Sequence, residues 1–260
     1  MSESIETINP VATGSIAIIG GTGLNQLGQS VLVAQRRIET PYGPTSAPLQ
    51  TLALGRRRFM FMARHGQPHK IPPHKINYRA NLWALREAGV TQVVAVNSVG
   101  GIAAAMTTGA IVVPHQIVDY TWGREHTYHD SDSLDHVDFT RPYTETLRQR
   151  ILRATSTAQI TAIDGGVYAA TQGPRLETAA EVDRLARDGC DIVGMTGMPE
   201  AALARELGLQ YASICLVVNP AAGRAPGEIT MADIQRVIDE GMGRVQSVLM
   251  HLVTTWRPYP

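Results

Sequence analysis

The chain has few aromatic residues, no excess of either charge and only two cysteines. Phe, Trp and Tyr make up 5% of the 260 residues, which argues against a surface on which many bases stack. Lys plus Arg number 23 and Asp plus Glu number 23, so the formal net charge is zero, whereas nucleic-acid-binding domains usually carry a basic excess. We therefore expect no nucleic-acid partner, and any anionic ligand must be small and held by a few local donors.

The two cysteines, Cys190 and Cys215, lie inside apolar runs and have no metal-binding spacing. Such isolated thiols are typical of a reducing compartment. The first residues lack the basic and apolar regions of a signal peptide, and the apolar runs are far shorter than the ~20 residues of a membrane span. Three histidines, His65, His69 and His74, lie close together without an acidic or thiolate partner in register. We expect a cytoplasmic protein with no membrane partner and no metal.

Apolar runs alternate with amphipathic segments after a polar tail at residues 1–14. The runs predict strands that are buried on both faces, at Ser15–Ile19, Phe59–Met62, Gln92–Val96, Ala110–Val113, Val167–Ala170 and Ala212–Val218. Helical spacing is found at Tyr78–Ala88, Thr144–Thr155, Thr178–Asp188, Pro199–Leu207 and, most clearly, from Met231 to Leu252. Thr230 is a candidate N-cap for the last of these helices.

No linker, repeat or change of composition divides residues 15–260, so we expect one α/β domain. A (β/α)₈ barrel would have a similar length. Six or seven unevenly spaced strands instead favour a mixed, twisted β-sheet flanked by helices. The segment from Asp119 to Pro142 is too long for a simple connection and is predicted to be a functional loop.

Three of the predicted strands end in small or basic residues that could hold one anion. The first enters Gly20–Gly23, where backbone N–H groups and the Thr22 hydroxyl could donate, although the spacing matches neither a dinucleotide fingerprint nor a P-loop. The second is followed by Arg64 and His65, which suit phosphate oxygens. The third ends at Ser98 and two glycines. Each motif taken alone could equally be a structural turn or a solvated side chain. In an open α/β sheet, however, the carboxyl ends of the strands meet where ligands bind.

Six motifs follow one another along the chain: GGTG at 20–23, ARHG at 63–66 with HKINYRANLWAL after it, NSVGG at 97–101, TQGPRLET at 171–178, GMTGMPE at 194–200 and ASICLVVN at 212–219. In this combination the chain resembles the trimeric purine nucleoside phosphorylases, and above all their methylthioadenosine and methylthioinosine phosphorylase branch. The resemblance covers nearly the whole chain. It implies a single-domain nucleoside phosphorylase fold, a homotrimer, and cleavage of a purine nucleoside by inorganic phosphate, with no other cofactor.

The resemblance also implies roles for individual residues. Phosphate ligands fall on Thr22, Arg64, His65, Ser98, Val99 and Thr196. Met195 falls where the family lays a methionine against the ribose. In the implied mechanism phosphate stabilises and attacks a ribosyl cation, Arg64 and His65 place the phosphate, and Asn219 donates to the departing base.

The base-binding positions depart from the methylthioadenosine enzymes. Those enzymes carry an Asp-x-Asp pair where this chain has Asn219 and Ala221, and usually a serine where it has Glu177. A 6-oxopurine accepts at O6 and N7 and donates from N1, so an amide donor and a carboxylate acceptor complement it. A mismatch would cost ~1–3 kcal/mol per unsatisfied group. Asn219 could instead be a turn residue before proline, and Glu177 a first-turn acid of a helix, but the paired change favours a hypoxanthine-type base.

The sugar-binding positions favour a methylthio group. Inosine-cleaving members of the family carry a histidine downstream of the base-reading asparagine, whereas this chain has none between Asn219 and His251. The matching region around Ala232 is small or apolar, which disfavours a 5′-hydroxyl. His136 resembles the residue with which the branch closes the pocket from a neighbouring subunit. We expect methylthioinosine as the substrate, with inosine or guanosine and then methylthioadenosine as alternatives.

Two other classes of function remain open at this point. One is a non-catalytic nucleoside sensor, and the other is a nucleosidase that uses water. Phosphate donors together with base-reading residues argue against both.

Overall fold

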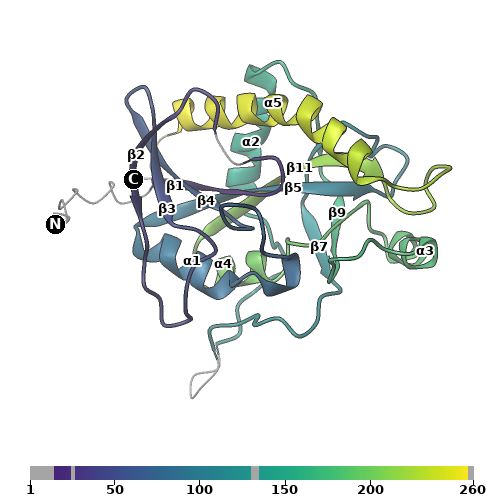
Figure 1. Ribbon diagram of the computed structural model, residues 1–260, viewed down its shortest axis with the longest axis horizontal. Coiled ribbons are helices and arrows are strands. Elements are labelled where there is room, and N and C mark those ends of the chain that lie inside the picture. The colour runs from purple at the N-terminus through teal and green to yellow at the C-terminus, as the bar shows by residue number, and fades with distance from the viewer. Residues whose placement is uncertain (1–14, 25–26, 130–134, 257–260) are drawn as a thin grey trace.

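The computed structural model describes residues 15–24, 27–129 and 135–256, so the tail predicted at 1–14 lies outside the described residues. The strands are β1 (Ser15–Gly20), β2 (Val31–Arg36), β3 (Leu49–Leu54), β4 (Arg57–Ala63), β5 (Val90–Gly101), β6 (Ile111–Val113), β7 (Gln116–Asp119), β8 (Ala162–Asp164), β9 (Val167–Ala170), β10 (Ile192–Gly194) and β11 (Gln210–Pro220). The helices are η1 (Pro73–Lys75), α1 (Tyr78–Glu87), α2 (Glu145–Thr157), α3 (Ala179–Arg187), α4 (Glu200–Glu206) and α5 (Met231–Thr255) (Figure 1).

The strands form one mixed sheet whose central strand is β5. Its neighbours β1 and β11 run parallel to it, and its last residues pair antiparallel with β10. The strand order along the main path is β2-β3-β4-β1-β5-β10-β9-β7, and β11, β6 and β8 branch from β5. This confirms the mixed α/β sheet and excludes the barrel, because β3 pairs antiparallel with both β2 and β4.

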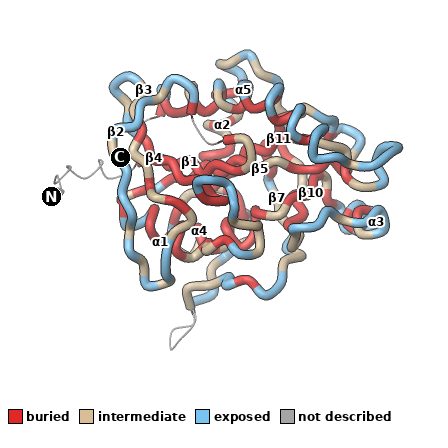
Figure 2. The backbone as a smooth tube through the Cα atoms, viewed as in Figure 1, coloured by how far each residue is buried: buried red, intermediate tan, exposed pale blue. Residues whose placement is uncertain are grey.

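Successive side chains along the central strands point to opposite faces of the sheet, so the hydrophobic core is divided between these two faces. Ile16 and Ile18 pack with α2 and α5 on one face, whereas Ala17 and Ile19 pack with α1 and α4 on the other. The two helix pairs lie above and below the sheet in Figure 1. Figure 2 shows that the central strands are buried throughout while β2 is largely exposed. The long buried runs of the sequence arise from this double cover.

The expected helices are confirmed, and Thr230 caps α5 by accepting a hydrogen bond from the backbone N–H of Asp233 at 3.1 Å. The prediction of six or seven strands was wrong, because the described residues form eleven. Three of the missed strands, β2, β3 and β7, lack a long buried run, and β8 and β10 have three residues each. Such strands depend on pairing with neighbours rather than on their own periodicity.

One further expectation is corrected. The third strand does not end before the glycines, because β5 continues through Gly100 and Gly101. A side chain at Gly101 would collide with the carbonyl oxygen of Met106, so these glycines allow close packing within the sheet. In the segment from Asp119 to Pro142, the described residues beyond β7 form neither helix nor strand.

Candidate active site

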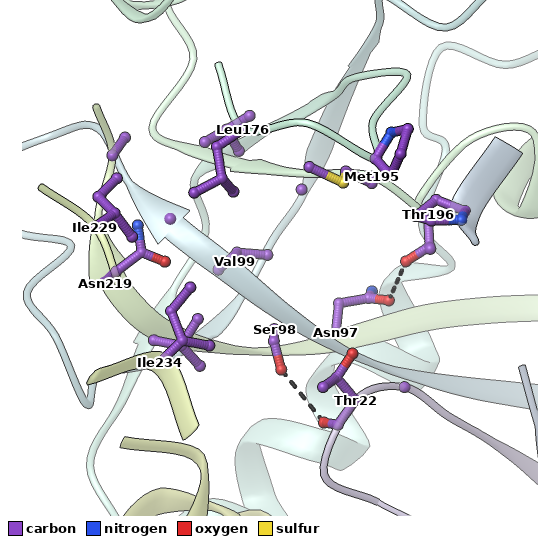
Figure 3. Close-up of a pocket in the computed structure, with 18 of the residues that line it drawn as sticks. Thr22, Asn97, Ser98, Val99, Leu176, Met195, Thr196, Asn219, Ile229 and Ile234 are labelled. Carbon is purple, nitrogen blue, oxygen red and sulfur yellow. Dashed lines mark hydrogen bonds between the residues drawn. The ribbon is translucent and has the colours of Figure 1, made fainter. Parts of the chain in front are cut away.

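A cavity of about 220 Å³ lies where β1, β4, β5 and β11 deliver their carboxyl ends beneath one face of α5. Polar side chains lie at one end, and apolar side chains together with Asn219 lie at the other (Figure 3). A wider opening of about 540 Å³ adjoins the second end and shares Leu176, Glu177 and Asn219 with the cavity. The polar end is lined mostly by buried residues, and the cavity adjoins the wider opening at its other end.

The glycine loop after β1 depends on close packing. A Cβ at Gly21 would lie 2.5 Å from the carbonyl oxygen of Val96 and 3.0 Å from Nη1 of Arg64. A side chain at Gly23, whose φ is +86°, would collide with Ile238 of α5. The loop therefore carries Thr22 into the space between β5 and α5, where Ser98 Oγ donates to the Thr22 carbonyl at 3.4 Å.

Arg64 is completely buried and is fixed by a buried acid. Its Nε and Nη2 donate to the two carboxylate oxygens of Glu200 at 2.7 and 2.9 Å, and its Nη1 donates to the Val96 carbonyl at 3.0 Å. Tyr211 Oη also donates to Glu200, at 2.8 Å. Burial alone would lower the pKa of Arg64, but the Glu200 charge raises it above its ordinary value, so the guanidinium stays charged. The guanidinium is thus held rigidly, and its charge is balanced within the protein.

His65 lies beside Arg64 and is held through one ring nitrogen. Its Nδ1 lies 2.8 Å from the Ile71 carbonyl, which can only accept, so Nδ1 carries the proton in the neutral ring. Burial and then the Arg64 charge lower the pKa of His65 to about 4. The Arg64 charge is therefore balanced by Glu200, and the lowered pKa of His65 favours its neutral ring at neutral pH.

Behind the polar end, a buried hydrogen-bond chain orients Thr196. Thr196 Oγ1 donates to Asn97 Oδ1 at 3.0 Å, and Asn97 Nδ2 donates to Ser213 Oγ at 2.6 Å. Because its proton is directed at Asn97, the Thr196 hydroxyl presents its lone pairs to the cavity. The polar end is thus organised before any ligand arrives.

The opposite end has fewer internal partners. Glu177 accepts a hydrogen bond from Thr171 Oγ1 at 2.6 Å, which leaves the remaining lone pairs of the carboxylate available. Asn219 donates to the carbonyl of its own neighbour, Pro220, at 2.6 Å, a local contact that a ligand can replace. Ala221 is buried against the same wall. A carboxylate acceptor and an amide donor therefore share this end of the cavity.

The structure brings ten of the predicted site residues to the same cavity: Thr22, Arg64, His65, Ser98, Val99, Glu177, Met195, Thr196, Asn219 and Ala221. Ala232 is exposed on α5 and does not line the cavity of its own chain. Ile234 and Ile238, which lie on the inward face of the same helix, line the cavity together with Ile229 and Met231. His136 is exposed and does not line the cavity of its own chain.

Sequence reasoning missed Glu200, Asn97 and the apolar face of α5. Glu200 stands in the motif GMTGMPE, and Asn97 in NSVGG, but neither motif shows that these side chains point inward. The helical spacing of Ile234 and Ile238 was read as core packing, which is the usual outcome for such a stripe. Within the described ranges, no group of three or more His, Cys, Asp or Glu residues could hold a metal ion. No helix in the described part of the chain is long and apolar enough to cross a membrane.

Comparison with known proteins gives one family for the whole described chain. The model of the phosphorylase superfamily matches residues 15–254. A relative from Pseudomonas syringae pv. tomato, a probable S-methyl-5′-thioinosine phosphorylase, is 54% identical over 92% of this chain and 98% of that protein. A probable 6-oxopurine nucleoside phosphorylase from Thermococcus kodakarensis is 38% identical over 92% of this chain and 91% of its own length. The solved structure of Schistosoma mansoni methylthioadenosine phosphorylase with adenine has a TM-score of 0.88 at 30% identity and covers 92% of this chain and 91% of that one.

Proposed function

This chain belongs to the phosphorylase superfamily and is an enzyme that transfers pentosyl groups, and we propose a specific substrate for it. The proposed reaction is the cleavage of S-methyl-5′-thioinosine by inorganic phosphate. The products are hypoxanthine and 5-methylthioribose 1-phosphate. One observation carries the proposal: a single cavity joins a closed polar end to an end that holds Asn219, Glu177 and an apolar face of α5. These features match phosphate, a 6-oxopurine and a methylthio group respectively.

Phosphate occupies the polar end in this proposal. Thr22 donates to it through its hydroxyl, and Ser98 does so after releasing the Thr22 carbonyl. Arg64 adds a remaining guanidinium N–H, and Thr196 accepts from a phosphate or ribose hydroxyl. Because Glu200 balances the Arg64 charge, the phosphate keeps an uncompensated negative charge beside the anomeric carbon. That charge favours the ribosyl cation that forms as the bond between C1′ and N9 breaks. A phosphate oxygen then bonds to C1′.

The base lies at the opposite end. Asn219 releases the Pro220 carbonyl and donates to N7 or O6, while Glu177 accepts from N1–H. The electron pair of the broken bond moves into the purine, so the hydrogen bond from Asn219 strengthens in the transition state. Glu177 and Asn219 are half-buried, and a bound base would cover them. Leaving either group unpaired in that complex would cost ~1–3 kcal/mol, which disfavours adenine nucleosides.

The sugar lies between the two ends, with Met195 against the ribose. Its 5′ substituent faces Ile234 and Ile238, which offer no hydrogen bond to a hydroxyl. Burying a hydroxyl there without a partner is unfavourable, whereas a thioether suits an apolar wall. This contrast favours a 5′-methylthio nucleoside over inosine.

The assembly and setting are part of the same proposal. The exposed His136 would close the pocket of the next subunit in a homotrimer, where it would cover the exposed side chains Leu176 and Met231. Phosphate is the only co-substrate required, and no further cofactor has a role in the mechanism. Two free, buried cysteines suit the reducing cytoplasm.

A phosphorolysis panel tests the proposal. Purified protein is given methylthioinosine, methylthioadenosine, inosine, guanosine or adenosine, with and without phosphate, and the free base is quantified. We expect the highest kcat/KM for methylthioinosine and no turnover without phosphate. Turnover without phosphate would identify a nucleosidase, and binding without turnover would identify a sensor.

Cleavage of inosine or guanosine is the second candidate. Asn219 and Glu177 recognise the 6-oxopurine and do not depend on the 5′ substituent, and one relative is a probable 6-oxopurine nucleoside phosphorylase. The panel separates the two, because equal kcat/KM values for inosine and methylthioinosine would favour the second.

A further inference from the structure

Arg124 is a buried cation in the long segment that follows β7, and it does not line the cavity. Its guanidinium carbon lies 5.6 Å from the centre of the Tyr78 ring. Within the part of the chain that the structure describes, no carboxylate forms an ion pair with it. Its hydrogen bonds go to oxygens of uncharged groups, and most of these are backbone carbonyls.

Those carbonyls belong to two separate segments. Nη2 donates to the carbonyls of Thr171 and Gln172 at 3.2 and 2.8 Å, and Nε donates to the Gln172 side chain at 3.1 Å. Nη1 donates to the carbonyls of Met195 and Met198 at 2.9 and 2.6 Å. A single planar fork therefore joins the segment after β9 to the segment after β10.

Each of these segments carries one side of the cavity. The Thr171 hydroxyl holds Glu177, and the segment after β10 contains Met195 and Thr196. The Arg124 contacts thus lie directly behind the carboxylate of the base end and behind the residues next to the sugar and phosphate.

We propose that Arg124 is a positioning residue that fixes the spacing between Glu177 and the Met195–Thr196 segment. It acts through the backbone and touches no substrate. The expected effect on catalysis rests on the function proposed above. The link that Arg124 makes between the two segments is independent of that function.

The shape of the guanidinium explains why arginine is needed. Arginine places several N–H groups in a rigid plane, so it can reach two segments at once, whereas a lysine ammonium is a single point. The segment that supplies Arg124 is itself anchored, because Thr127 Oγ1 and the Tyr128 N–H donate to Glu206 of α4 at 2.8 and 2.7 Å. The Arg124 guanidinium is therefore fixed both by the carbonyls that it contacts and by the attachment of its own segment to α4.

The test compares Arg124→Met and Arg124→Lys with Arg148→Met. Arg148 is a suitable control because it is also buried and also donates to carbonyls, those of Val113 and Pro114 at 3.1 and 2.9 Å, but does not line the cavity. Melting temperature, kcat and KM are measured for methylthioinosine and methylthioadenosine. Native-state hydrogen exchange is followed in peptides that cover residues 167–178 and 192–199.

For Arg124→Met we expect kcat/KM for methylthioinosine to fall about 10- to 100-fold, because misplacing catalytic groups by ~1 Å has effects of this size. Preference over methylthioadenosine should fall as well, because Glu177 loses its fixed position, and Arg124→Lys should recover part of both. Both peptides should exchange at least ~10-fold faster than in the wild type. In Arg148→Met we expect a lower melting temperature with unchanged KM values.

A purely structural role would lower the active fraction, and so reduce the maximal rate for both nucleosides by one factor without changing KM or preference. That result, or unchanged exchange in both peptides, would overturn the proposal. If Arg124→Met does not fold, Arg124→Lys and Thr171→Val provide the same comparison. If the wild type cleaves no nucleoside but both peptides still exchange faster in the variant, the proposed function fails while the positioning role stands.

Discussion

The two ends of the cavity differ in how much of their structure exists before a ligand binds. At the phosphate end, Arg64, His65, Asn97 and Thr196 are buried, and each has a hydrogen-bond partner within the protein. At the nucleoside end the side chains are more exposed, and among the described residues the Asn219 side chain bonds only to the carbonyl of its own neighbour. In the proposed function the first end holds one small anion, whereas the second selects among nucleosides. Changes at the first should therefore affect phosphate and folding, and changes at the second should affect the choice of nucleoside.

The largest effect is expected from Arg64→Ala. It removes a phosphate donor and leaves Glu200 as an unpaired buried charge, which should lower the free energy of unfolding by about 3–5 kcal/mol. The apparent KM for phosphate should rise about 10- to 100-fold, since a hydrogen bond to a charged group is worth ~1.5–3 kcal/mol. Chemical denaturation and initial rates at varied phosphate measure both effects.

A double variant separates the two consequences. Replacing the pair together, as Arg64→Met with Glu200→Leu, removes the unpaired charge and should restore much of the stability but not the phosphate affinity. A variant that loses affinity for the nucleoside alone would show that Arg64 does not serve the phosphate end.

Asn219→Asp should have the next largest effect, confined to the nucleoside end. An acid that can both accept and donate suits a 6-aminopurine, so the kcat/KM of methylthioadenosine relative to methylthioinosine should rise about 10- to 100-fold, in line with ~1–3 kcal/mol per mismatched group. The phosphate KM should stay the same. Asn77→Asp is the control away from the cavity, because aspartate can still cap α1. It loses the hydrogen bonds from Asn77 Nδ2 to the Tyr42 and Pro44 carbonyls, so stability should fall while the ratio stays the same. An unchanged ratio would remove Asn219 from base selection.

Ile234→Thr should shift the choice of sugar by a smaller amount. A hydroxyl on the inward face of α5 offers a hydrogen-bond partner to a 5′-hydroxyl. The ratio of kcat/KM for inosine to kcat/KM for methylthioinosine should therefore rise about three- to tenfold. Val245→Thr places the same hydroxyl in a buried part of α5 that does not line the cavity, and should change stability without changing the ratio. Equal ratios in both variants would argue that α5 does not contact the sugar.

The smallest effect on activity is expected for the titration of His65. Its folded-state pKa is lowered to about 4 from 6.5, so the unfolded chain binds the proton first as the pH falls. The free energy of unfolding should therefore decline between pH 6.5 and 4, and activity due to His65 should be constant above that window. His65→Asn should flatten this decline, and exposed His115→Asn should not. A decline of the same steepness in His65→Asn would contradict the assignment.

The two ends also differ in what the sequence could predict. The buried runs of β1, β4, β5 and β11 and the spacing in α5 are periodic, so the central strands and helices could be predicted before the structure was known. The rule that strand ends meet at one edge brought Thr22, Arg64 and Ser98 together correctly.

What could not be predicted depends on contacts between distant residues. Glu200 faces Arg64 across 136 positions, and no local pattern indicates that pairing, so the balanced charge of the polar end was missed. Ala232 was assigned instead of Ile234 because a shift of two residues on a helix turns a side chain from the cavity to the surface. The exposed strand β2 and the three-residue strands β8 and β10 carry too little periodicity to be recognised.

The most direct test of the account is a competition assay. Equal concentrations of methylthioinosine, methylthioadenosine and inosine are mixed with the enzyme and phosphate, and the release of hypoxanthine, adenine and the two sugar 1-phosphates is followed. We predict that hypoxanthine and 5-methylthioribose 1-phosphate form first, at least ~10-fold faster than adenine or ribose 1-phosphate, and only with phosphate. Faster release of adenine, or formation of ribose 1-phosphate at the same rate, would contradict it.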